Sequence, residues 1–77
     1  MNYHENSKHE LLQNLNFWRE IAFDNMLYLR KLYLHDEVSH MVLVAELADI
    51  GYKVRNALIE ICAITEELET RLEINKL

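Results

Sequence analysis

Residues 43–72 form a proline-free stretch in which apolar residues recur at alternating steps of four and three. The series is Leu43, Leu47, Ile50, Val54, Ala57, Ile61, Ile64 and Leu68. Steps of four and three keep side chains on one side of an α-helix, and they are the heptad spacing of helices that bury one long seam. The spacing therefore predicts a helix over residues 37–75 that packs along its length against another helix.

A second series with the same spacing predicts a first helix over residues 8–34. Its members are Leu11, Leu15, Trp18, Ala22, Asn25, Leu29 and Leu32. Ser7 and Glu10 precede it with the spacing of a capping box, in which each side chain accepts a hydrogen bond from the other residue's backbone amide. Apolar residues on both flanks widen the series to about half of the helix circumference, which is more than contact with one helix hides.

The apolar pattern lapses between the two series, around His35, Asp36 and Glu37. Asp36 is a favourable N-cap residue, and Glu37 is favourable in the first turn of a helix. The sequence therefore predicts a turn here and an antiparallel two-helix hairpin. One continuous helix is an alternative, because no glycine or proline marks the turn.

Gly51, the one glycine of the chain, raises a further alternative. A glycine inside a helix costs about 1 kcal/mol relative to alanine, so a break at this position would give a three-helix bundle. The seam keeps its phase across the glycine, which favours an unbroken helix. We attribute the glycine to a close approach by the helix that carries Trp18 and Ala22.

The amount of apolar surface indicates that the hairpin does not act alone. Hydrophobic residues make up 51% of the 77 residues, and a chain this short buries only about 60% of the surface of its unfolded state. We expect an all-α fold, a single helical domain over residues 1–77 in which the hairpin dimerises into a four-helix bundle. Residues 1–6 are expected to be disordered, with Tyr3 the one side chain able to dock.

Several apolar side chains fall where the seams do not cover them. Phe23, Leu27 and Leu34 lie on the back of the first helix, and the end of the second helix extends beyond the first. Aromatic residues dominate association energies, so Trp18 is added as an anchor. The expected interface consists of Trp18, Phe23, Leu27, Leu34, Leu68 and Leu72. These residues predict a non-enzymatic protein–protein interaction module: a homodimeric adaptor, chaperone-like subunit or regulator with a further protein partner.

The charge pattern gives little support for nucleic-acid binding. The net charge is −5 and the basic residues are dispersed. An acidic surface can also imitate nucleic acid, so an inhibitor of a nucleic-acid-binding or basic protein stays open as an alternative. The lone Cys62, the polar first residues and the lack of an apolar run of about 18 residues predict a cytoplasmic protein without a membrane span.

Catalytic motifs are not found, since one glycine cannot build a nucleophile elbow or a phosphate loop. Glu37 and His40 have the Glu-x-x-His spacing of di-iron carboxylate bundles, which makes a metal-binding bundle an alternative. The end of the first helix offers cations rather than further ligands, so no metal or cofactor is expected. Glu37 is interpreted as a capping residue, and His40 as closing the end of the core.

Asn25 is the polar member of the first seam. A buried asparagine among leucines can fix the register of a coiled coil at some cost in stability. It can equally donate a hydrogen bond to a neighbouring backbone carbonyl, and the sequence leaves both roles open.

Overall fold

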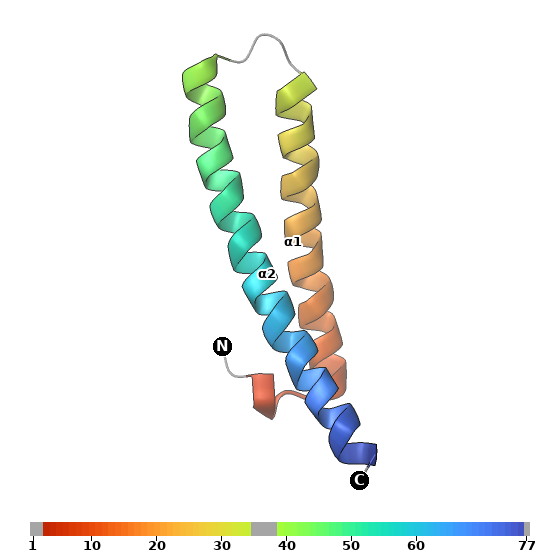
Figure 1. The fold of residues 1–77 in the computed structure, drawn as a ribbon. Helices are drawn as coiled ribbons and strands as arrows, with labels where there is room; N and C mark the ends of the chain where they lie inside the picture. The colour runs from red at the N-terminus through yellow and green to blue at the C-terminus, as the bar shows by residue number, and fades with distance from the viewer. Residues whose placement is uncertain (1–2, 35–38, 77) are drawn as a thin grey trace.

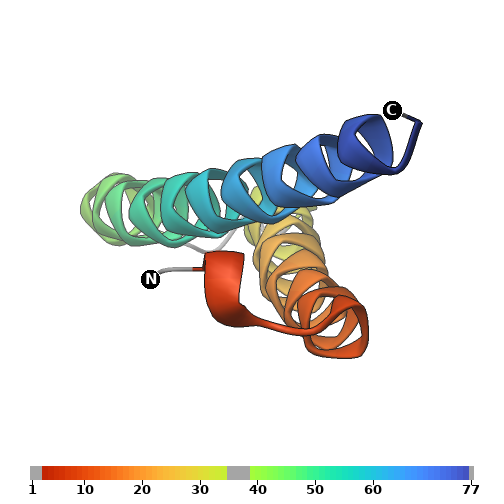
Figure 2. The same ribbon diagram turned by 90° about the horizontal axis from the view of Figure 1, so that it is seen from below.

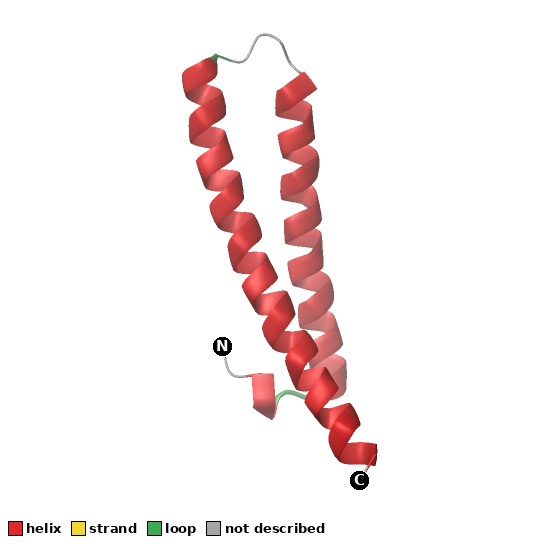
Figure 3. Cartoon of the chain, viewed as in Figure 1, coloured by secondary structure: helices red, strands yellow, loops and turns green. Residues whose placement is uncertain are grey.

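The computed structural model describes residues 3–34 and 39–76, and the described part is all-helical (Figure 3). A short 3₁₀ helix, η1 (Tyr3–Glu5), precedes α1 (Lys8–Leu34) and α2 (His40–Lys76). The two long helices run antiparallel and form a hairpin that measures 57 × 17 × 16 Å (Figure 1). The predicted helical hairpin is confirmed, and η1 and the last turns of α2 lie at the end of the molecule remote from the start of α2.

The core follows the two predicted seams. All positions of both series are buried or half-buried. The fully enclosed side chains are concentrated in the middle and at the end remote from the turn, and comprise Leu11, Ala22, Ile50, Ala57 and Ile64. Near the turn, Leu29, Leu32, Leu43 and Leu47 are only half-buried. Two helices without a third layer cannot enclose these side chains.

Serine residues begin both long helices. The Ser7 amide donates to Glu10 Oε1 over 3.3 Å, and the Glu10 amide donates to Ser7 Oγ over 3.1 Å, which confirms the capping box. At the start of α2, the Val42 amide donates to Ser39 Oγ over 3.3 Å. The prediction that α2 begins at residue 37 was wrong by three positions. Ser39 caps the helix, while Asp36 and Glu37 lie outside the described residues.

Gly51 lies inside an unbroken helix, because α2 is continuous from His40 to Lys76. The three-helix alternative is therefore wrong, and so is the single continuous helix, since α1 and α2 lie side by side. The reason expected for the glycine is also wrong. A Cβ added at Gly51 would meet no atom within 4 Å, so no described part of the hairpin approaches it closely.

Residues 3–6 adopt a defined conformation in place of the disorder expected for residues 1–6. Tyr3 is 4% exposed and packs in one cluster with Leu11 and Ile64. The view along the hairpin shows this segment lying against one side of the helix pair (Figure 2). It forms a third layer over the part of the core farthest from the turn. Sequence reasoning identified Tyr3 as able to dock but missed the polar contacts that hold its neighbours.

The capping box makes a testable contribution to stability. Replacing Ser7 by alanine leaves the Glu10 amide without its acceptor, and loss of an N-cap side chain costs about 1 kcal/mol. For a chain of this size we expect the melting temperature of Ser7→Ala to fall by about 4–8 °C. Circular dichroism at matched protein concentration measures the change. Gln13→Ala, an exposed mid-helix substitution, is the control and should melt with the wild type.

Candidate protein interface

Large apolar side chains cover much of the outside of the hairpin. More than a third of the surface of each is exposed, from 41% for Leu27 to 82% for Met41. On α1 they are Leu12, Phe17, Phe23, Met26, Leu27, Tyr28, Tyr33 and Leu34. On α2 they are Met41, Val42, Val44, Tyr52, Leu58, Ile59, Leu72 and Ile74. Exposed apolar patches are typical of sites that contact another protein, so these side chains are the candidate interface.

The hairpin has two broad sides, and the seam positions define them. Face A consists of the residues that come directly after a seam residue in the sequence. Face B consists of the residues that come directly before a seam residue. In an antiparallel pair, positions that follow the seam fall on the same side of both helices. On α2, face A holds Val44, Ala48, Gly51, Arg55, Leu58, Cys62, Thr65 and Glu69. On α2, face B holds Val42, Glu46, Asp49, Lys53, Asn56, Glu60, Ala63 and Glu67.

Face B of α2 is charged. Lys53 Nζ lies 2.9 Å from Asp49 Oδ2, and this hydrogen bond raises the pKa of the Lys53 ammonium above its ordinary value. Two further carboxylates of this face, Glu60 and Glu67, lie toward the other end of the helix and contact the N-terminal segment. Face B therefore carries polar groups along its length and is partly covered by the chain itself.

Arg71 and Glu67 fasten the N-terminal segment to α2. Arg71 Nε donates to Glu67 Oε1 over 2.9 Å, and the Arg71 guanidinium also donates to the backbone carbonyls of His4 and Asn6. His4 Nδ1 lies 3.5 Å from the same Glu67 oxygen. The guanidinium is only partly exposed, so these hydrogen bonds to a charged group are worth more than those of a surface pair.

Tyr3 is held by a polar partner as well as by apolar packing. Its hydroxyl donates to Glu60 Oε2 on α2, and its side chain lies in one cluster with Leu11 of α1 and Ile64. Trp18 packs against this cluster. Burial, followed by the hydrogen bond to the Glu60 carboxylate, raises the pKa of Tyr3 above its ordinary value. The segment is thus joined to both long helices.

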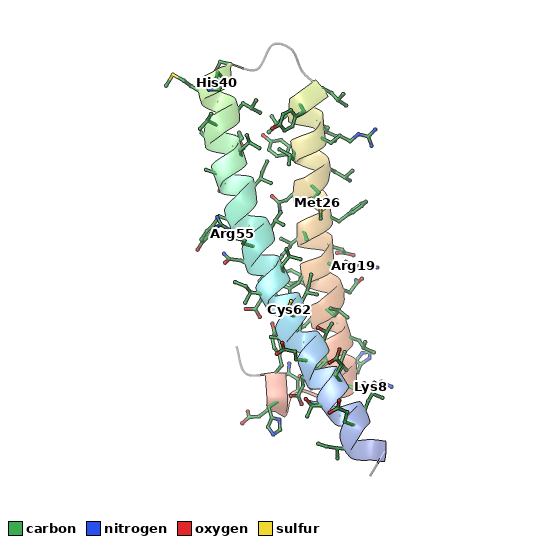
Figure 4. The ribbon with its side chains drawn as sticks, in the orientation of Figure 1. Lys8, Arg19, Met26, His40, Arg55 and Cys62 are labelled. Atoms are coloured by element: carbon green, nitrogen blue, oxygen red, sulfur yellow. The ribbon has the colours of Figure 1, made fainter. Side chains whose placement is uncertain are left out.

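Face A has the opposite character. On α2, Arg55 and Glu69 are its only charged residues, and Ala48, Gly51 and Cys62 are small. A hollow of about 480 Å³ lies beside it, lined by Arg55, Leu58, Ile59, Cys62, Ala63 and Glu66. On α1, face A instead carries large side chains: Leu12, Phe23, Met26 and Tyr33, with Arg19 and Arg30 between them. Lys8 and Arg19 project from α1 away from the N-terminal segment (Figure 4).

The residues predicted to form the interface are not all available for one. Phe23 is 59% exposed, and Leu27, Leu34 and Leu72 are also exposed. Trp18 and Leu68 are instead half-buried and pack against the cluster of Tyr3, Leu11 and Ile64. The docked N-terminal segment uses them inside the chain. Sequence reasoning did not include Met26 and Leu58, although the same spacing rule places both on face A.

The remaining polar candidates have local roles in the structure. Asn25 Nδ2 donates to the Ile21 carbonyl over 2.7 Å, so its side chain bonds to its own helix. His40 is exposed at the start of α2, and its predicted companion Glu37 lies outside the described residues. Within residues 3–34 and 39–76, no three His, Cys, Asp or Glu side chains converge as a metal site requires.

Neither long helix contains, within its described residues, a segment apolar enough to cross a membrane. Comparison with protein-family models, with curated proteins and with solved structures found no match. The functional conclusion therefore depends on the exposed faces of the hairpin.

The raised pKa of Tyr3 predicts a pH dependence of stability. The folded chain holds the phenolic proton more tightly than the unfolded chain, so this contribution is complete below the unfolded pKa of about 10 and is lost as the pH rises through the folded pKa. We expect the free energy of unfolding to fall above pH about 10, and to fall less in Tyr3→Phe. Urea unfolding across this range measures the difference. Tyr52→Phe, at an exposed position, is the matched control, and a curve for Tyr3→Phe that overlays the wild type would contradict the prediction.

Proposed function

We propose that the chain is a non-enzymatic protein–protein interaction module that dimerises into a four-helix bundle. The main observation behind this proposal is the solvent-accessible surface area of the chain. The chain exposes 6272 Å², whereas a compact folded monomer of 9.2 kDa exposes about 4900 Å². The excess of about 1300 Å² exceeds the roughly 800 Å² that each partner contributes to a standard protein interface.

The composition of the exposed surface supports the same function. The exposed surface includes many aliphatic and aromatic side chains, and burying apolar area yields about 25 cal/mol per Å². The helices also have the length and heptad spacing that four-helix bundles use, in which each helix packs against two neighbours. Each helix of this hairpin has one neighbour and an apolar strip beside its seam. A second hairpin would give each helix its second neighbour.

A module of this kind keeps surface for a further protein after it has dimerised. Leu27 on α1 and Tyr52 and Ile59 on α2 lie opposite the seams, where a face-to-face dimer does not reach. These exposed side chains support the adaptor or regulator role, in which the bundle presents an outer apolar surface to a protein partner.

Sedimentation equilibrium tests the proposal. The wild type is expected to be a dimer at micromolar concentration, and Phe23→Asp should shift it towards monomer by at least tenfold in the dissociation constant while retaining its helical circular dichroism. Ile50→Asp should unfold the chain, because Ile50 is 3% exposed and a charge cannot be buried there without a partner.

Gln13→Asp adds the same charge to α1 at an exposed position outside faces A and B, and it should sediment as the wild type does. A wild-type chain that is monomeric and melts cooperatively at micromolar concentration would contradict the proposed function.

A further inference from the structure

We propose that face A is the dimer interface, and that the two copies are related by a two-fold axis parallel to the helices, so that α1 of each copy packs on α2 of the other. This inference rests on the proposed function and adds to it the face, the orientation and the register. It follows from the contrast between the two faces and from the sizes of the side chains on face A.

Face B cannot accept a second hairpin along its whole length. The N-terminal segment lies on it, held by Tyr3 to Glu60 and by Arg71 to the carbonyls of His4 and Asn6. Toward the turn, burying face B would remove Glu46, Asp49 and Lys53 from water, which is costly for charged groups. Among the described residues face A carries no such cover, and on α2 Arg55 is the one charged residue at its middle positions.

The antiparallel geometry fixes which residues of face A lie at the same height. The turn joins Leu34 to His40, and Leu11 packs in one cluster with Ile64. When a residue of α1 and a residue of α2 lie at the same height along the hairpin, their two residue numbers therefore add up to about 74. Phe23 of α1 is then level with Gly51 of α2. By the same rule Met26 is level with Ala48, and Leu12 is level with Cys62.

A two-fold axis along the helices keeps these heights while it exchanges the helices. Phe23 and Met26 of one copy then face Gly51 and Ala48 of the other, so large side chains meet small ones, as close packing requires. The alternative two-fold axis, across the helices, packs α1 on α1 and α2 on α2. It would crowd large side chains together on one side and leave gaps between small ones on the other.

This register explains why position 51 is a glycine. No atom of residues 3–34 or 39–76 lies within 4 Å of a Cβ placed there, so the missing side chain makes room for none of these residues. A partner's Phe23, which is 59% exposed in the hairpin, would occupy that space. The cost of glycine in a helix is then offset by contact in the dimer.

The charges at the edges of face A fit the register at one end and oppose it in the middle. Lys8 is level with Glu66, which gives an opposite pair between copies. Arg19 is level with Arg55, which gives a like-charge pair. Both guanidiniums bond to their own helix, since Arg19 donates to Asn16 Oδ1 over 2.6 Å and Arg55 donates to the Gly51 carbonyl over 3.4 Å. They can remain at the solvated rim, where such repulsion is small.

Disulfide formation tests the register, because Cys62 is the only cysteine and is exposed on face A. Leu12→Cys places a second thiol level with the Cys62 of the partner, so mild oxidation with copper phenanthroline should give a covalent dimer in most of the protein. Gln13→Cys, at the same height but outside faces A and B, is the matched control. It should stay mostly monomeric on a non-reducing gel, as should the oxidised wild type.

Side chains of increasing size at position 51 provide a second test of the interface, in variants that are expected to fold. Gly51→Ala and Gly51→Leu both improve helix propensity, and the Cβ that each adds meets no described atom within 4 Å. Gly51→Leu should weaken the dimer at least tenfold by sedimentation, and Gly51→Ala should weaken it much less.

The outcomes separate this inference from the proposed function. A wild-type dimer in which Leu12→Cys cross-links no faster than Gln13→Cys, or forms its disulfide within one chain, overturns the register and leaves the interaction module standing. A dimer unaffected by Gly51→Leu overturns the assignment of face A. A monomeric wild type overturns both proposals.

Discussion

Two helices in contact can hide only one strip of each from water, and the architecture of this chain follows from that limit. The heptad spacing supplies the strip, and every seam position is buried or half-buried. The apolar arc on α1 is wider than the strip, so Phe23 and Met26 remain outside it. The stability of the chain therefore depends on what covers the rest of the arc.

Within the described residues, the chain supplies part of that cover itself, at the end remote from the turn. The 3₁₀ helix at Tyr3–Glu5 closes the core around Leu11 and Ile64. Toward the turn no third layer exists among the described residues, and Leu29, Leu32, Leu43 and Leu47 stay half-buried. Burial therefore decreases along the hairpin from the chain ends to the turn. A partner hairpin on face A would lie along the full length and would enclose the half that is open.

The regular part of the fold could be predicted from the sequence because it depends on spacing alone. Both seams, the capping box and the continuity of α2 through Gly51 follow from residues three or four positions apart. The start of α2 was misplaced because Asp36 and Ser39 are both good caps, and only the path of the turn decides between them.

The candidate interface was harder to predict. The docked segment depends on Tyr3, Glu60 and Arg71, which are far apart in sequence and follow no period. Without that contact, Trp18 and Leu68 looked available to a partner. The reason predicted for Gly51 was wrong for a related reason. A glycine in a helix indicates that another group approaches closely, but the sequence does not show whether that group belongs to the same chain.

The bond between Tyr3 and Glu60 has a consequence for how the chain is made. These residues are 57 positions apart, so the ribosome produces α1 and much of α2 before Tyr3 has its partner. Leu11 meanwhile lacks Ile64 as well, because that partner follows Glu60 in the sequence. The end of the core on which the N-terminal segment docks can therefore be completed only after nearly the whole chain has been synthesised.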